Sequence, residues 1–150
     1  MIEPTARRFR PTAAWLGAAL LLAAACSDAT DVSAGLDAPY KYTARDGGGA
    51  ALVTGELTLA VAEDSIVSGS WSTHWAFGAD TTTEVGPQVG HGTLAGRLRH
   101  DTLLVDLTPG NADNNAVLLG TWTGDTIVGS WTWITVTGPR TSGPFTATKP

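Results

Sequence analysis

The most reactive side chain in this 150-residue sequence is its single cysteine, Cys26. A cysteine thiolate is a nucleophile, and its sulfur can carry a covalent group. Cys26 directly follows an uncharged run dominated by Ala and Leu, residues 13–25, which itself follows Arg7, Arg8 and Arg10. The 13 residues of this run are too few for a membrane-spanning helix, which needs about 20. The pattern is typical of a secretory signal segment.

Tryptophan and glycine carry the other candidate chemistry, which is the binding of a small molecule. If the later segments are strands of alternating burial, one inner face receives three indole rings and three glycines: Trp71, Trp122, Trp131, Gly96, Gly120 and Gly129. Large rings beside missing side chains leave two alternatives. Either the rings fill the space above the glycines as a core, or a cavity remains that holds a small, largely apolar ligand.

The sequence has no recognisable catalytic or metal-binding motif. His74, His91 and His100 are not spaced as metal ligands. No Gly-x-Ser-x-Gly nucleophile elbow occurs, and the acidic pair at 63–64 lies in an expected turn, where solvated carboxylates are normal. We therefore expect a protein that is not an enzyme and has no metal ion or other cofactor.

The stretch Leu22 to Cys26 (LAAAC) resembles the lipobox of bacterial lipoprotein signal peptides. Ala23 stands where the lipobox has a residue such as Leu. The resemblance implies that residues 1–25 are cleaved and that Cys26 becomes an N-terminus carrying a diacylglyceryl thioether and an N-linked acyl chain such as palmitate. Several acyl chains give stable attachment to membrane lipid. Ser27, in place of Asp, favours the outer membrane, facing the periplasm or the surface. The alternative is ordinary secretion with a free thiol.

The chain from Cys26 onward has the size of one domain, 125 residues. From residue 27 it has six Lys and Arg against 13 Asp and Glu, a formal charge of −7. This overall charge argues against a nucleic-acid partner and against direct docking on anionic lipid. With one cysteine no intrachain disulfide can form, so stability must come from an apolar core. Residues 26–38 are small, acidic and without periodicity, which predicts a lipidated cysteine and flexible tether before a domain over 39–150.

Three similar segments predict β-hairpins that turn at an aspartate. Segments 57–67, 94–104 and 118–128 each have Leu seven residues before the Asp, a hydroxyl residue after it, and then two aliphatic residues. Gly124-Asp125 suits a two-residue loop, because glycine tolerates positive φ, whereas the loops at Asp64 and Asp101 could be one or two residues longer. Counting outward from two-residue loops pairs Trp122 with Ile127, Gly120 with Gly129, Leu118 with Trp131, Leu98 with Leu103, Gly96 with Val105, and Leu94 with Leu107.

The first segment has one extra residue between its aspartate and its tryptophan. Ser68-Gly69-Ser70-Trp71 stands where the third segment has Gly129-Ser130-Trp131. A β-bulge at Ser68-Gly69 would absorb this residue and return Trp71 to the face of Ile66. We therefore predict a bulge there and an inward-facing Ile66.

The domain is expected to be all-β with about eight strands, because Thr, Val, Gly and Trp dominate and no run after the signal segment has helical periodicity. The strands are expected near 39–45, 51–62, 65–76, 88–99, 102–108, 115–122, 126–136 and 142–148. Sequential antiparallel strands favour a single up-and-down β-barrel, which leaves no open edge. A two-sheet β-sandwich is the alternative. A membrane-spanning barrel is disfavoured, because Arg97, Arg99 and Asp106 would face lipid.

This strand pattern and its Trp-Gly composition resemble the architecture of lipocalins and avidins. The resemblance implies a barrel that binds a small ligand, and it extends to no residue-by-residue motif. We therefore expect a membrane-anchored envelope lipoprotein whose barrel binds a small, largely apolar ligand. The alternative is a structural or interaction lipoprotein with a filled barrel, and a hydrolase is a third. Residues 78–92 form the longest irregular stretch, either a lid at one end of the barrel or an ordinary exposed loop.

Overall fold

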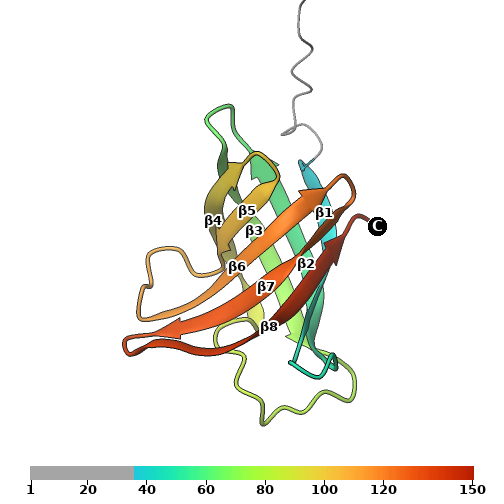
Figure 1. The fold of residues 1–150 in the computed structure, drawn as a ribbon, viewed down its shortest axis with the longest axis vertical. Coiled ribbons are helices and arrows are strands. Elements are labelled where there is room, and N and C mark those ends of the chain that lie inside the picture. Colours follow the sequence, from blue (N-terminus) through green and yellow to red (C-terminus); the bar gives the residue numbers. More distant parts are fainter. Residues whose placement is uncertain (1–35) are drawn as a thin grey trace, which may run out of the picture.

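The structure, a computed structural model, describes residues 36–150 and folds them into one closed antiparallel barrel (Figure 1). Strands adjacent in sequence are adjacent in the sheet, and β1 pairs with β8 to close it. The strands are β1 (Ala38–Arg45), β2 (Ala51–Val61), β3 (Ile66–Trp75), β4 (Gly90–Arg99), β5 (Thr102–Asp106), β6 (Asn114–Thr123), β7 (Thr126–Thr135) and β8 (Gly138–Thr148). The all-β up-and-down barrel is confirmed, and the two-sheet sandwich is wrong.

Two of the three expected hairpins have the register that the sequence predicts. Arg99 pairs with Thr102 and Thr123 with Thr126, so each loop has two residues. Both loops begin in the left-handed region, at φ 56° for His100 and 71° for Gly124. Five of the six inward pairs are confirmed: Trp122–Ile127, Gly120–Gly129, Leu118–Trp131, Leu98–Leu103 and Gly96–Val105. The pairing of β4 with β5 ends at Ala95–Asp106, so the sixth pair, Leu94 with Leu107, is not part of the ladder.

The predicted bulge at Ser68-Gly69 is wrong. The pairing of β2 with β3 runs unbroken from Val61–Val67 through Ser68 to Trp75. The extra residue lies in the turn instead, where Ala62 N donates to Ile66 O at 2.9 Å and Ser65 takes φ 65°. A longer loop shifts the strand by one residue, so Val67 faces inward and Ile66 is 43% exposed.

The last strand is longer than predicted and begins at Gly138 instead of near residue 142. Gly138 has φ 105°, which makes the tight turn from β7 possible. A register shift between Trp133 and Ile134 then places Pro139 opposite Ile134. Proline is tolerated near such an irregularity at the start of a strand.

Alternation of side chains along the strands produces the core. On β5, Leu103 and Val105 are buried whereas Thr102 and Leu104 are exposed. The same period of two on the other strands fills the barrel interior. Its largest fully buried side chains are Trp131, Tyr40, Tyr42, Phe145, Leu36, Leu52, Leu57, Leu59, Leu107, Leu118, Ile127 and Gln88.

The barrel has two different ends. The turns β2–β3, β4–β5 and β6–β7 lie at the N-terminal end, where the chain enters β1 (upper end in Figure 1). There Val61 N donates to Asp37 Oδ1 at 2.7 Å. The other four connections lie at the opposite end, here called the loop end, and the longest is residues 76–89 between β3 and β4. Within residues 36–150 we find no helix long and apolar enough to cross a membrane.

Candidate functional site

The tryptophans expected at a binding site lie inside the barrel. Trp71 and Trp131 are 5% and 1% exposed, and Trp122 is partly buried against the same core. Trp71 Nε1 donates to Leu107 O at 2.6 Å, and Trp131 Nε1 donates to Arg45 O at 2.9 Å. Backbone acceptors thus hold both rings, which pack as part of the barrel core. Their contact with a ligand stays a prediction, and Cys26 lies outside the described residues.

The three predicted glycines lie where backbones come close together. A Cβ on Gly96 would be 2.0 Å from Leu104 O, and one on Gly129 would be 2.0 Å from Leu119 O. A Cβ on Gly120 would be 2.9 Å from the ring of Phe145. The missing side chains therefore allow neighbouring strands and rings to approach, and their role toward a ligand also stays a prediction.

The β3–β4 loop closes the loop end from inside, which favours a lid over an ordinary exposed loop. Val85 is 3% exposed and Gln88 is fully buried. We call residues 76–89 the lid. Its fully buried side chain, Gln88, is a polar group in an apolar interior. Burial of this amide without hydrogen bonds would destabilise the fold by about 1–3 kcal/mol.

The side-chain amide and the backbone carbonyl of Gln88 all have hydrogen-bond partners. We call Gln88 and its partners, Tyr42, Thr73 and the Val85 carbonyl, the polar cluster. Tyr42 Oη donates to Gln88 Oε1 at 2.7 Å, and Gln88 Nε2 donates to Val85 O at 2.8 Å. Thr73 Oγ1 donates to the backbone carbonyl of Gln88. Burial raises the pKa of Tyr42 far above its ordinary value, so the phenol stays protonated and acts as a donor.

A second set of contacts holds the lid at the rim of the barrel. Arg140 forms a bidentate pair with Glu84, Nε to Oε2 at 2.6 Å and Nη2 to Oε1 at 2.8 Å, and Thr141 Oγ1 donates to Glu84 O at 2.6 Å. The Arg140 guanidinium also lies 5.2 Å from the centre of the Trp133 ring. A Cβ on Gly86 would be 2.4 Å from that ring, so glycine permits the lid to lie against it. We call these contacts the latch.

A hollow of about 400 Å³ remains between the lid and the rim. Two indoles, polar lid residues and one amide line it: Trp75, Trp133, residues 81–87 and Asn114. Trp133 Nε1 donates to Asn114 Oδ1 at 2.8 Å, so its ring is oriented. Sequence reasoning missed this groove and the polar cluster, since Gln88 and Tyr42 are 46 residues apart and neither belongs to a motif.

The three histidines form no metal-binding group in the part of the chain that the structure describes. His74 lies on β3 with Nε2 at 3.3 Å from Thr54 Oγ1, and His91 and His100 are exposed on other elements. Within residues 36–150 no group of three His, Cys, Asp or Glu side chains is arranged to hold a metal ion.

The fold is similar to that of one solved avidin-like protein, described as the structure of a bradavidin2–biotin complex. The TM-score is 0.50 and the identity is 19%, over 75% of this chain and 97% of that chain. This likeness shows that the chain has the fold of an avidin-like eight-stranded barrel. No protein-family model and no curated protein sequence matches the chain.

Proposed function

We propose that this protein is a lipid-anchored protein of the bacterial cell envelope whose barrel binds a small, largely apolar ligand at the loop end. The observation that carries this proposal is the polar cluster under the lid. A core that only packs needs no hydroxyl at this depth, yet Tyr42 donates a hydrogen bond to an amide carbonyl there. The ligand takes the place of the Gln88 side chain when the lid opens.

The polar cluster defines the chemistry of the ligand. The Tyr42 hydroxyl donates to a carbonyl oxygen, as it does to Gln88 Oε1 at 2.7 Å. An apolar side chain packs beside it, since the centre of the Tyr42 ring lies 5.7 Å from that of the Phe145 ring. The ligand therefore combines a carbonyl or amide group with an apolar body. Biotin, named with the similar barrel, is the first probe, because it joins a urea carbonyl to an aliphatic chain.

The proposed anchor and the proposed site are at opposite ends of the molecule. The chain enters β1 at the N-terminal end, whereas the lid lies at the loop end (Figure 1). Asp37 is bonded to the barrel, so with Cys26 acylated the ten residues between them, 27–36, reach about 34 Å when fully extended. This arrangement directs the lid away from the lipid, toward the periplasm or the medium. An unacylated thiol in the intact mass of the native protein would contradict the anchor.

The test uses the full chain, processed in a lipoprotein-exporting bacterium and held in nanodiscs. Biotin and a series of small amides are titrated while tryptophan emission and heat are recorded. In a Gln88→Ala background, where no lid side chain competes for the Tyr42 hydroxyl, Tyr42→Phe should weaken binding about tenfold, the loss expected for one buried hydrogen bond of about 1.4 kcal/mol. The paired change Glu84→Gln with Arg140→Gln should tighten binding, because a closed lid lowers apparent affinity in proportion to the open fraction.

A structural or interaction protein with a filled barrel is the second candidate. It is favoured by the closed lid and by the indole N–H groups of Trp71 and Trp131, which both bond to backbone oxygens. Its expectation is different: neither the native chain nor the latch variant binds any probe, and no small molecule accompanies the protein in native mass spectrometry. Lys41→Gln, on the outer wall, is the control and should leave binding unchanged.

A further inference from the structure

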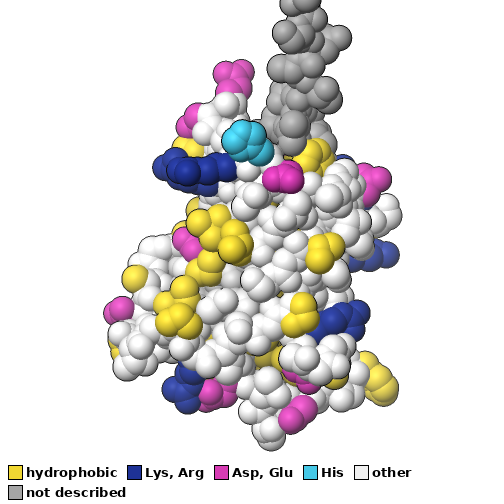
Figure 2. Space-filling model, viewed as in Figure 1, with side chains coloured by type: hydrophobic (Ala, Val, Ile, Leu, Met, Phe, Trp, Pro, Cys, Tyr) yellow, Lys and Arg dark blue, Asp and Glu magenta, His cyan; other side chains and the backbone are white. Residues whose placement is uncertain are grey.

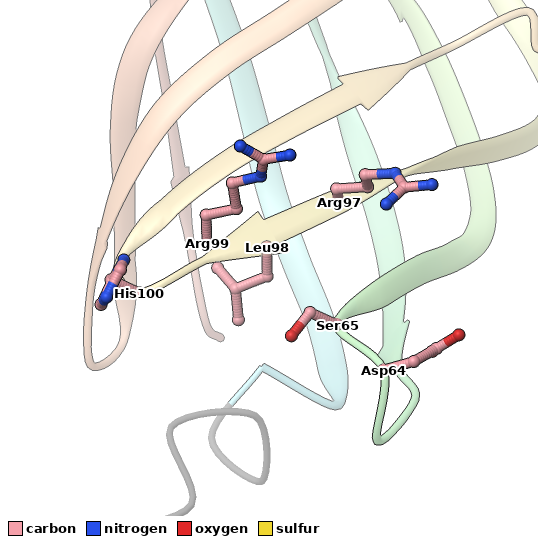
Figure 3. A pocket seen from close by; sticks show the side chains of 6 residues that line it. All are labelled: Asp64, Ser65, Arg97, Leu98, Arg99 and His100. Carbon is pink, nitrogen blue, oxygen red and sulfur yellow. The ribbon is translucent and has the colours of Figure 1, made fainter.

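Two arginines project side by side from the outer wall of the barrel, far from the lid. Arg97 and Arg99 share the outer face of β4, and Figure 3 shows both guanidinium groups directed away from the strand while Leu98 points to the other side. Same-face neighbours on a strand are about 6.8 Å apart. Neither arginine has an ion pair or hydrogen bond within residues 36–150, whereas Arg140 is paired with Glu84 and Lys149 with Asp125.

An apolar row lies directly beside these arginines. The register places Ile66, Arg97, Leu104 and Leu119 opposite one another across β3, β4, β5 and β6. Leu104 and Leu119 are 46% and 49% exposed, and Figure 2 shows hydrophobic side chains gathered on this wall. A hollow of about 370 Å³ is lined by Arg97, Arg99, Thr102, Leu104 and Leu119. The two guanidinium groups therefore lie beside the apolar side chains of Leu104 and Leu119.

The aspartates of the two adjoining turns accept hydrogen bonds within those turns. Asp64 Oδ1 accepts from Ile66 N at 3.3 Å, and Asp101 Oδ1 accepts from Thr102 Oγ1 at 3.3 Å. Asp106 lines a separate hollow on the other side of Arg97. The positive charge of Arg97 and Arg99 is therefore not neutralised by an ion pair on this wall.

The wall adjoins the N-terminal end. Leu98 N donates to Ser65 O at 2.9 Å, so the β2–β3 turn contacts β4 between the two arginines. The strand that leads into this turn ends at Val61, which bonds to Asp37 at the start of the described chain. With the anchor proposed above, lipid headgroups are within reach of this end of the barrel.

We propose that this wall binds a phosphate-bearing amphiphile, with the phosphate between Arg97 and Arg99 and an aliphatic chain over Leu104 and Leu119. Guanidinium groups match phosphate oxygens with paired, charge-assisted hydrogen bonds. The hollow has the size of a small-ligand site. A second copy of the chain fits less well: four strands about 4.8 Å apart, over the roughly 17 Å length of the five-residue β5, give a footprint of roughly 330 Å², against about 800 Å² per partner in a stable interface. Two arginines would also face two others.

The first experiment titrates decyl phosphate, inorganic phosphate and decanol into the full chain in phosphatidylcholine nanodiscs, with empty nanodiscs subtracted. Decyl phosphate should bind at least about tenfold more tightly than either of the others, because it alone uses both parts of the site. Arg97→Gln with Arg99→Gln should weaken it at least about tenfold. Leu104→Ser with Leu119→Ser should weaken decyl phosphate and leave inorganic phosphate unchanged. Lys41→Gln with Arg45→Gln removes equal charge elsewhere and should change binding less than about twofold.

The second experiment identifies the source of the phosphate. The full chain is placed in vesicles of phosphatidylcholine alone or with phosphatidylglycerol, and hydrogen exchange of β4 and β5 is compared. Protection that appears with phosphatidylglycerol and disappears in the Arg97→Gln, Arg99→Gln variant assigns the phosphate to the membrane. Binding of decyl phosphate without protection by phosphatidylglycerol assigns it to a free amphiphile. Equal binding by this variant and the native chain overturns the proposal. A native chain that sediments as a dimer, and a Leu104→Ser, Leu119→Ser variant that sediments as a monomer, also overturn the proposal and assign the wall to self-association.

Discussion

The hydrogen bond between Tyr42 and Gln88 gives the sharpest test of how the lid and the barrel are joined. Tyr42→Phe leaves Gln88 Oε1 buried without its donor, at 2.7 Å in the native structure. An unpaired buried acceptor destabilises a protein by about 1–3 kcal/mol. Gln88→Met keeps the length of the side chain and leaves the Tyr42 hydroxyl unpaired, with a similar loss. The bond from Thr73 to the Gln88 backbone carbonyl is unaffected.

The double variant separates this bond from other effects. If the two side chains act independently, the losses add to about 2–6 kcal/mol. If they share one bond, the double variant loses no more than about 1–3 kcal/mol, because replacing both partners leaves fewer buried groups unpaired. We therefore expect a coupling energy of about 1 kcal/mol or more, measured by equilibrium urea unfolding at pH 7 with equal m values.

A control pair sets the scale of this measurement. Thr121 is exposed on the outer face of β6, so Thr121→Ala combined with Tyr42→Phe should be additive within about 0.5 kcal/mol. If the Tyr42 and Gln88 changes prove equally additive, the lid is not bonded to the barrel as described, and the argument for a ligand carbonyl at Tyr42 fails with it.

Four further predictions follow from the packing and the charges. Burial raises the pKa of Tyr42 above the unfolded value near 10, so stability should be full below pH 10 and fall as pH rises further, and Tyr42→Phe should reduce that fall in pH-dependent urea titrations. Gly129→Ala should lower the melting temperature clearly, because its Cβ would be 2.0 Å from Leu119 O; unchanged melting would contradict this close approach. Trp131→Ala should lower the free energy of unfolding by about 3–5 kcal/mol, as expected of a core ring. Glu84→Gln should change global stability little, since the Glu84–Arg140 pair is exposed, yet it should speed amide exchange in the lid. Exchange no faster than in the native chain would mean that the latch does not hold the lid.

The strand order and most of the register follow from local patterns. In the second and third hairpins the aspartate turn and the alternation around Leu98, Leu103 and Trp122 agree, so counting outward gives the observed pairs. The first hairpin fails because one extra residue can be absorbed either in the ladder or in the turn. The sequence does not distinguish these, and the left-handed conformation of Ser65 decides for the turn.

The sequence left residues 78–92 open between a lid and an exposed loop, and it did not predict the contacts that hold the lid. Gln88 is one polar residue in an irregular stretch, and its burial depends on Tyr42, 46 residues earlier. Glu84 and Arg140 are 56 residues apart and meet only after the barrel closes. Periodicity reports which face of a strand is buried, but it says nothing about where a long loop folds back.

The closure between β1 and β8 is the barrel's seam, and it has consequences for how the protein is made. Every other pair of neighbouring strands is consecutive in sequence, whereas the seam joins Lys41 to Thr148 and Ala44 to Phe145 through four residue pairs. Hairpins can thus form in turn as the chain emerges, but the barrel closes only after its final strand arrives. A stalled or clipped C-terminus would leave β1 and β7 as two open edges ready to pair with other chains.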